Sequence, residues 1–158
     1  MEKKNKKYLT RAEALKKLQA YCAYQDRCHK EVRSKLLDLG VYGGDLEEVI
    51  VELIEEKFLD EERFARSFAR GKFRYKKWGK LKIKQELKRK DISAYCLQKA
   101  MEEIEEKDYL ETLDGLIEKK NSQLADTNDY QRKQKIAQFV FRKGYESNLI
   151  WERINRIL

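Results

Sequence analysis

Lysine and arginine side chains dominate one stretch of this sequence, residues 63–90. The stretch contains thirteen of them against a single acid, Glu86, and therefore has a net charge of +12. The whole chain has a net charge of +8, so the remaining residues sum to −4. Basic clusters of this density bind phosphates or acidic protein surfaces. The chemistry that these residues indicate is therefore the binding of a polyanion.

The basic residues also follow a helical spacing. Arg63, Arg66, Arg70, Arg74 and Lys77 recur at intervals of three or four residues, which places them within about 80° of arc on a helix. Like charges at this spacing repel one another, so a merely solvated helix face explains the row poorly. The spacing predicts a basic edge on a helix over 61–76, followed by a second basic helix that begins near residue 80.

We predict one binding surface on these two helices, in which each side chain supplies charge complementarity to phosphates or to acidic side chains. Its residues are Arg63, Arg66, Arg70, Lys72, Arg74, Lys76, Lys77, Lys80, Lys82, Lys84, Lys88 and Arg89. Secondary candidates precede this stretch: Arg27, Lys30 and Arg33. An alternative for the arginines among these three is pairing with the nearby acids Glu31 and Asp38.

Aromatic residues lie among the basic ones, as in proteins that stack unpaired bases beside a basic groove. Tyr75 shares a helix face with Phe64 and Phe68, and we expect this face to pack in the core. Trp78 follows at the helix break and is also expected to pack. Phe73 lies nearer the basic row, and its pattern leaves packing and exposure both open.

The residue types needed for catalysis are present without the spacing that catalysis needs. His29 adjoins Cys28, but neighbours on a helix point about 100° apart and do not form a nucleophile–base pair. The three cysteines show no metal-binding spacing, and the phosphate loop GxxxxGK[ST] is absent. The acid-rich residues 47–62 and 102–111 are expected to be solvated and to pair with bases of neighbouring repeats. We expect no catalytic residue, no metal and no cofactor.

Composition predicts an all-α protein. Charged and hydrophobic residues each make up 41% of the chain, which contains no proline and only seven glycines. No stretch approaches the roughly 18 apolar residues of a membrane span, and the first residues lack the apolar centre of a signal peptide. An odd number of cysteines favours reduced thiols and a cytoplasmic location.

A repeat organises the chain. Gly40, Asp91 and Gly144 stand 51 and 53 residues apart, and each is followed by an apolar or aromatic residue. Apolar residues also recur four positions before these anchors and six, ten and thirteen positions after them. Each unit thus ends in a helix, a turn and a helix, and a further helix precedes it. A residue at the anchor must tolerate the left-handed conformation, which suits Gly and, at modest cost, Asp.

The repeat predicts an elongated, curved arrangement of three tandem three-helix units. We expect a flexible basic arm at 1–9, then repeats at 10–57, 58–106 and 107–158. Thr10 and Asp45 are expected to cap helices, and Val32, Leu36 and Leu37 to point inward.

These units resemble the RecX family, the bacterial regulatory proteins that act on the RecA recombinase. Residues 58–65, FLDEERFA, match a family block that begins with leucine and an acid and ends with phenylalanine and alanine. Trp78-Gly79 and the basic helix ending at Ile92 match the next block, with Asp91 in place of the usual glycine. Residues 26–32, DRCHKEV, are similar to a third block, with Cys28 in place of serine.

The resemblance implies a function without enzymatic activity or a cofactor. Family members bind in the helical groove of the RecA filament on single-stranded DNA, and restrain its growth, its ATP hydrolysis and strand exchange. We therefore expect the protein to be a monomer. Its expected partners are the RecA filament and single-stranded DNA, with duplex DNA as a possible further partner. Two alternatives stay open: a helical-repeat protein that binds DNA directly without RecA, and a scaffold protein.

Overall fold

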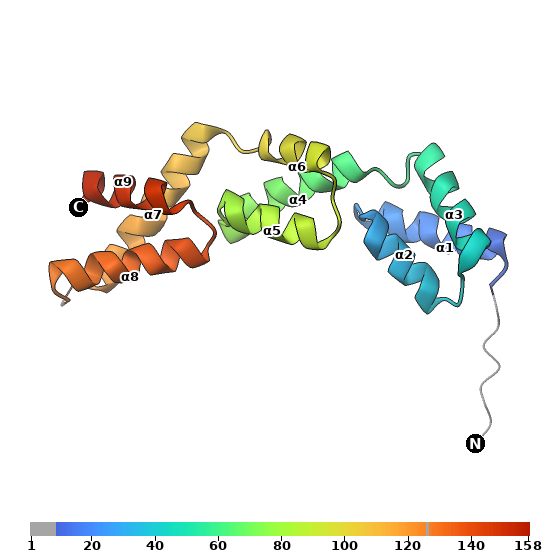
Figure 1. Ribbon diagram of the computed structural model, residues 1–158, viewed down its shortest axis with the longest axis horizontal. Helices are drawn as coiled ribbons and strands as arrows, with labels where there is room; N and C mark the ends of the chain where they lie inside the picture. The colour runs from blue at the N-terminus through green and yellow to red at the C-terminus, as the bar shows by residue number, and fades with distance from the viewer. Residues whose placement is uncertain (1–8, 126) are drawn as a thin grey trace, which may run out of the picture.

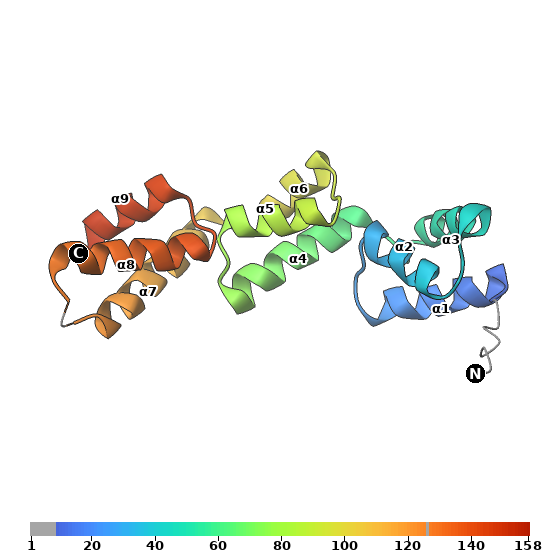
Figure 2. The same cartoon turned by 60° about the horizontal axis from the view of Figure 1, so that its bottom comes forward.

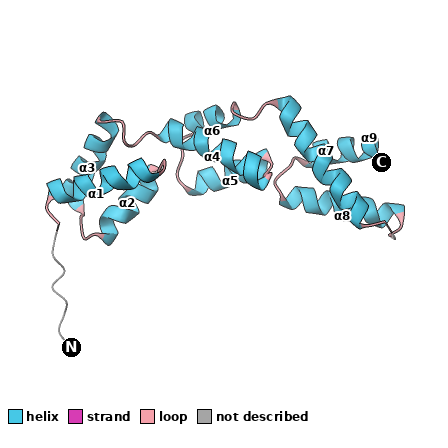
Figure 3. Ribbon diagram, turned by 180° about the vertical axis from the view of Figure 1, so that it is seen from behind, coloured by secondary structure: helices cyan, strands magenta, loops and turns pink. Residues whose placement is uncertain are grey.

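The structure, a computed structural model, describes residues 9–125 and 127–158. The expected basic arm lies outside this part of the chain except for Leu9, which packs against the core of the first three helices. Every regular element in the described residues is an α-helix (Figure 3), which confirms the all-α class. The helices are α1 (Arg11–Tyr24), α2 (His29–Asp38), α3 (Gly43–Glu55), α4 (Glu61–Lys76), α5 (Lys80–Arg89), α6 (Ala94–Met101), α7 (Glu106–Gln123), α8 (Asp129–Arg142) and α9 (Ser147–Ile157). None of these helices is both long and apolar enough to cross a membrane.

The described helices form three bundles of three, α1–α3, α4–α6 and α7–α9. The bundles follow one another in an elongated, gently bowed row (Figures 1 and 2), which confirms the tandem three-helix repeats. Glu106, expected at the end of the second repeat, is the first residue of α7. The basic stretch occupies α4 and α5, in the middle of the row.

The three residues aligned as repeat anchors share one backbone conformation. Gly40, Asp91 and Gly144 have φ angles of 80°, 58° and 105°, a region that L side chains adopt only rarely. Each anchor ends the turn after the second helix of its bundle. The residue that follows each anchor is buried, as the repeat predicts: Val41, Ile92 and Tyr145.

The apolar residues in the described part of the chain form two cores. One lies within the first bundle and includes Leu18, Leu36 and Leu53. The other runs continuously through the second and third bundles and includes Phe73 and Tyr145. The second and third bundles therefore share their interior, whereas the first bundle has its own.

The face that α4 buries differs from the expected one. Phe64, Ala65, Ala69 and Phe73 are buried, while Tyr75 is 85% exposed. The short alanine side chains let α4 pack closely on α6, and this contact turns Phe73 inward and Tyr75 outward. The prediction that Tyr75 packs in the core is therefore wrong, and Phe73 is a core residue.

Two smaller expectations in the first bundle are also wrong. Leu37 is 52% exposed, because α2 buries only the stripe of Val32 and Leu36. Asp45 does not cap α3, which begins at Gly43 and places Asp45 in its first turn. Thr10 caps α1 as expected, since its side chain accepts a hydrogen bond from the Glu13 N–H.

Backbone contacts join the second bundle to the third. A Cβ on Gly79 would overlap the backbone of Gly144, so these two backbone segments touch without an intervening side chain. The Gly79 N–H donates to the Lys143 carbonyl at 2.7 Å, and the Leu81 N–H donates to the Gly144 carbonyl at 2.9 Å. The turn before α5 is therefore held directly against the turn before α9.

Two stacked tyrosines complete this joint. The rings of Tyr109 and Tyr145 lie 4.9 Å apart, centroid to centroid. The Tyr109 hydroxyl accepts from the Lys80 N–H at 3.0 Å and donates to Glu146, and the Tyr145 hydroxyl donates to the Lys77 carbonyl at 3.0 Å. These bonds fix the end of α4 and the start of α5.

The joint between the first and second bundles is more polar. Arg63 Nε lies 2.8 Å from Asp26 Oδ1, and Lys30 Nζ donates to the Arg89 carbonyl at 2.8 Å. Cys28 of the first bundle is buried in the core of the other two. Ion pairs and one buried thiol thus connect the first bundle to the rest.

Candidate nucleic-acid interface

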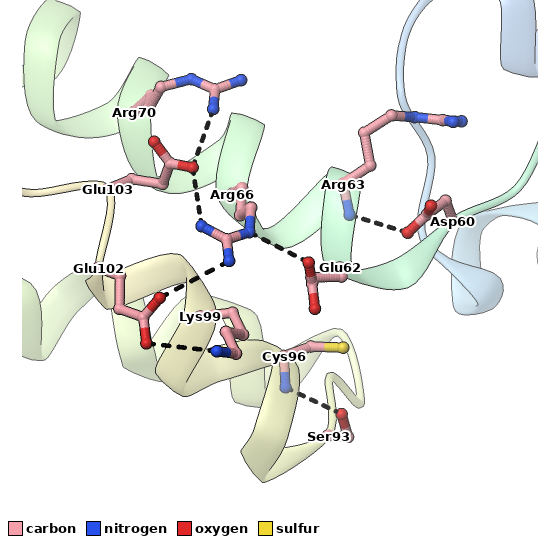
Figure 4. A network of polar contacts seen from close by, with 10 residues as sticks. All are labelled: Asp60, Glu62, Arg63, Arg66, Arg70, Ser93, Cys96, Lys99, Glu102 and Glu103. Atoms are coloured by element: carbon pink, nitrogen blue, oxygen red, sulfur yellow. Dashed lines mark hydrogen bonds and ion pairs between the residues drawn. The ribbon is translucent and has the colours of Figure 1, made fainter.

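Three arginines of α4 in the predicted binding set are engaged within the protein. Arg66 lies 3.0 Å from Glu103 and 3.2 Å from Glu62, and Arg70 lies 3.2 Å from Glu103 (Figure 4). Burial opposes ionisation of Glu103, but the hydrogen bonds from both arginines outweigh it and hold the pKa of this carboxyl below its usual value. Arg63 is occupied by Asp26 and by the carbonyls of two residues before α4. These arginines attach α4 to its neighbours.

Of the nine remaining predicted residues, one is paired with an acid of the described chain and eight are not. Arg89 pairs with Glu86 at 2.8 Å. The other eight form no ion pair with any residue in 9–125 or 127–158, and we call them the free bases: Lys72, Arg74, Lys76, Lys77, Lys80, Lys82, Lys84 and Lys88. They lie on the C-terminal part of α4, at its end and on α5. An unpaired cation keeps its full charge for an external anion, so the candidate site is this lysine-rich region rather than the arginine row.

Aromatic rings hold the side chains of some of the free bases in position. Phe68 and Trp78 meet edge to face, with centroids 6.4 Å apart. The Nζ atom of Lys72 lies 5.0 Å from the Trp78 ring centroid, and that of Lys82 lies 4.5 Å from it. Lys90 Nζ lies 5.9 Å from the Phe68 centroid. Cation–π attraction therefore holds three ammonium groups around one aromatic pair.

Lys90 is absent from the predicted set, although it ends the basic stretch. The sequence offered a usable indication, since it counts among the thirteen bases of 63–90. Trp78 is half-buried and packs against the core of the second and third bundles, in agreement with the expectation that it packs.

A groove lies between the first and second bundles, beside this aromatic pair. Its volume is about 480 Å³. The α4 side contributes Phe64, Phe68, Gly71 and the exposed Tyr75, and lysines stand among them. The first bundle contributes Asp26 and Glu31 among others. An open aromatic surface with adjacent cations suits a ligand that has both planar rings and negative charge.

The secondary candidates do not extend the free bases into the first bundle. The guanidinium of Arg27 lies 3.7 Å from the Tyr21 ring centroid and pairs with Glu31. Lys30 lies 3.7 Å from Asp91 in addition to its bond to the second bundle. Arg33 forms two hydrogen bonds to Glu47, the shorter at 2.5 Å. Their role as an external binding surface stays a prediction, and the geometry does not favour it.

The acid-rich segments pair within their own bundles. Glu47 pairs with Arg33 in the first bundle, and Glu102 and Glu103 pair with Arg66 in the second. The expectation that these acids pair with neighbouring repeats is wrong, because the three helices of one bundle bring opposite charges together at shorter range.

The thiol beside the histidine is placed for packing. Cys28 is fully buried, and its Sγ donates to Glu31 Oε1 at 3.3 Å. Burial raises the pKa of the Cys28 thiol, which keeps it protonated and weakens it as a nucleophile. Within the described residues no three His, Cys, Asp or Glu side chains gather as metal ligands would.

These features define an all-α helical-repeat protein with a basic middle unit. The second three-helix domain of RecX matches residues 60–101, and the third three-helix domain of RecX matches residues 106–154. The chain belongs to the RecX family.

Individual relatives agree with this assignment. The chain is 30% identical to the regulatory protein RecX of Halalkalibacterium halodurans over 84% of its own length and 50% of that protein. It is 28% identical to the regulatory protein RecX of Lactobacillus johnsonii over 92% of its own length and 54% of the relative. The chain thus spans about half the length of these curated relatives.

Solved structures share the fold. The crystal structure of RecX from Lactobacillus salivarius superimposes with a TM-score of 0.85 at 24% identity, covering 93% of this chain and 96% of the other. A second crystal structure, of a regulatory protein RecX, gives a TM-score of 0.83 at 21% identity, covering 92% and 73% of the two chains. These likenesses confirm the arrangement of the helices.

Proposed function

We propose that this protein is a non-enzymatic regulator that binds the RecA filament on single-stranded DNA. In this proposal it restrains ATP hydrolysis, filament growth and strand exchange, acting as a monomer in the cytoplasm. The observation that carries the proposal is the group of eight free bases on the middle bundle. Membership of the RecX family supports a regulatory role, because the relatives are named regulatory proteins, and the family resemblance of the sequence implies RecA as the partner.

The proposed mechanism is bridging. The three bundles form an elongated row with the free bases near its centre (Figure 1), and a row of helical repeats presents a long binding surface. Lysines at its centre are attracted to phosphates or to acidic side chains in a filament groove. A protein held in this way lies across neighbouring subunits and hinders their movement or addition.

Charge reversal on α5 tests the proposal. Lys84 and Lys88 are free bases four residues apart on α5, and Lys16 and Lys17 on α1 provide an exposed matched pair outside the site. The readout is RecA ATP hydrolysis on single-stranded DNA. We expect inhibition by the wild-type protein and by Lys16→Glu/Lys17→Glu, and strongly reduced inhibition by Lys84→Glu/Lys88→Glu.

A second measurement separates the alternative function. A protein that binds DNA directly, without RecA, should bind bare DNA and assembled filament with equal affinity at physiological salt. That result, together with no inhibition of ATP hydrolysis at stoichiometric amounts, would favour the direct DNA-binding protein. Intact binding by both charge-reversal variants would instead favour a scaffold role.

A further inference from the structure

The groove between the first and second bundles has an aromatic side chain that the fold does not use. Tyr75 is 85% exposed although it lies in the last turn of α4, two residues after the core residue Phe73. Exposed aromatic rings beside cations are the stacking platforms of proteins that bind single strands. We propose that this groove binds a single strand of nucleic acid, with one unpaired base stacked on Tyr75 and adjacent phosphates held by Lys72 and Lys76. The inference rests on the proposed function, because the strand in question is the one in the proposed filament.

The floor of the groove is open where a strand would need space. Gly71 lies on α4 between Phe68 and Tyr75, and a Cβ at this position would meet no atom within 4 Å. Glycine inside a helix is destabilising relative to alanine, and neither a close packing contact nor a positive φ requires it here. The missing side chain leaves room for a ring between the two aromatic residues.

The charge of the groove suits a phosphodiester. Lys72 and Lys76 are free bases that line it. The two acids on the opposite wall are already paired: Asp26 lies 2.8 Å from Arg63, and Glu31 lies 3.7 Å from Lys90. Neither acid therefore presents an uncompensated charge to a phosphate.

The same geometry selects a single strand over a duplex. Bases in a duplex are stacked on one another, so their faces cannot reach a ring inside a groove, whereas a base of a single strand can. Phosphate contacts alone would not make this distinction.

The experiment compares two fluorescent strands of equal length, an oligothymidylate and an abasic strand, by anisotropy with the full chain. Stacking on one ring is lost with the base while the phosphates remain, so we expect the wild-type protein to prefer oligothymidylate by about tenfold. Tyr75→Ala should remove this preference and Tyr75→Phe should keep it. Tyr130→Ala, at an exposed tyrosine on α8, is the matched control and should behave as the wild type.

A second variant tests the space rather than the ring. Gly71→Leu keeps every charge and fills the floor, so we expect it to lower oligothymidylate affinity about as much as Tyr75→Ala while the protein stays folded by circular dichroism. The inference is overturned if Tyr75→Ala and Gly71→Leu both keep the wild-type preference for oligothymidylate over the abasic strand. It is also overturned if Tyr75→Ala weakens filament binding but leaves the preference over the abasic strand intact, since a protein side chain would then occupy the groove.

The two proposals fail separately. Loss of the stacking preference is measured on free strands and does not involve RecA. The proposed function depends on inhibition of RecA and on Lys84 and Lys88, which do not line the groove.

Discussion

Gly79 and Gly144 touch backbone to backbone across the joint between the second and third bundles. The contact leaves no room for a side chain at either position. It lies beside two N–H to carbonyl bonds that cross the same joint. Because the continuous core of the second and third bundles closes around this contact, its geometry controls the stability of both.

Replacing Gly79 with alanine should therefore destabilise the protein. The added methyl group would overlap the Gly144 backbone, and overpacking of this kind costs about 1–3 kcal/mol. The measurement is the free energy of unfolding in urea. Gly115→Ala is the control, because a Cβ there meets nothing within 4 Å on α7, and we expect it to raise stability by about 0.5–1 kcal/mol. Equal stability of Gly79→Ala and the wild type would contradict the packing described for the joint.

Removing the Tyr145 hydroxyl should weaken the same joint by a smaller amount. Tyr145→Phe loses the hydrogen bond to the Lys77 carbonyl, which costs about 1 kcal/mol. Tyr130→Phe alters an exposed hydroxyl and should leave the melting temperature unchanged. Matching melting temperatures for all three proteins would show that the Tyr145 bond contributes nothing.

Alkaline pH should destabilise the protein through the stacked tyrosines. Burial raises the pKa of Tyr109, with a further contribution from its hydrogen bond to Glu146, and burial also raises the pKa of Tyr145. The folded state therefore favours the protonated hydroxyl groups of both tyrosines. Their contribution is fully present below the unfolded-state pKa of about 10 and is lost as the pH rises above it. The melting temperature of the wild-type protein should fall as the pH is raised from about 8 to about 11. It should fall less steeply in Tyr145→Phe.

Acidic pH should destabilise the protein through protonation of Glu103. Its pKa is lowered in the folded state despite burial, because Arg66 and Arg70 hydrogen-bond to it. The stabilisation is present above the unfolded-state pKa, roughly 4.3, and is lost as the pH falls through the lower folded value. Glu103→Gln should make the acid branch of the stability curve shallower. Glu118→Gln, which changes an exposed acid on α7, should leave the curve as in the wild type.

The salt dependence of DNA binding should distinguish free from paired bases. Each lysine that neutralises a phosphate contributes about one to the slope of log affinity against log salt. For a single strand the contribution is about 0.7 per phosphate, so Lys72→Gln/Lys76→Gln should lower the slope by about 1.4. Arg66→Gln/Arg70→Gln removes bases already paired with Glu62 and Glu103 and should change it little. Equal changes in the two variants would show that the internal pairs open on binding.

The repeat could be predicted because its residues are spaced regularly. Gly40, Asp91 and Gly144 precede apolar residues at matched distances, and all three adopt a positive φ. The buried face of α4 could not be predicted in the same way. Its centre is Ala65 and Ala69, and alanines give no pronounced apolar pattern beside several aromatic residues.

The charge of the site was predictable, but its free members were not. The excess of bases in 63–90 follows from the sequence. Which bases stay unpaired depends on acids that the fold brings from elsewhere, such as Asp26 to Arg63 and Glu103 to Arg66. The partners in these two pairs are 37 residues apart in the chain, so periodicity contains no information about them.

The two joints of the row differ in what holds them. Surface ion pairs such as Arg63–Asp26 each contribute at most about 1 kcal/mol and weaken with salt, whereas the glycine contact and the shared core are insensitive to it. We therefore expect α4–α9 to behave as one stiff six-helix body, to which α1–α3 is attached by the buried Cys28 and by ion pairs that weaken as the salt concentration rises. Ionic strength would then set how far the first bundle reaches and, under the proposed function, the range of RecA filament pitches that a single molecule can span.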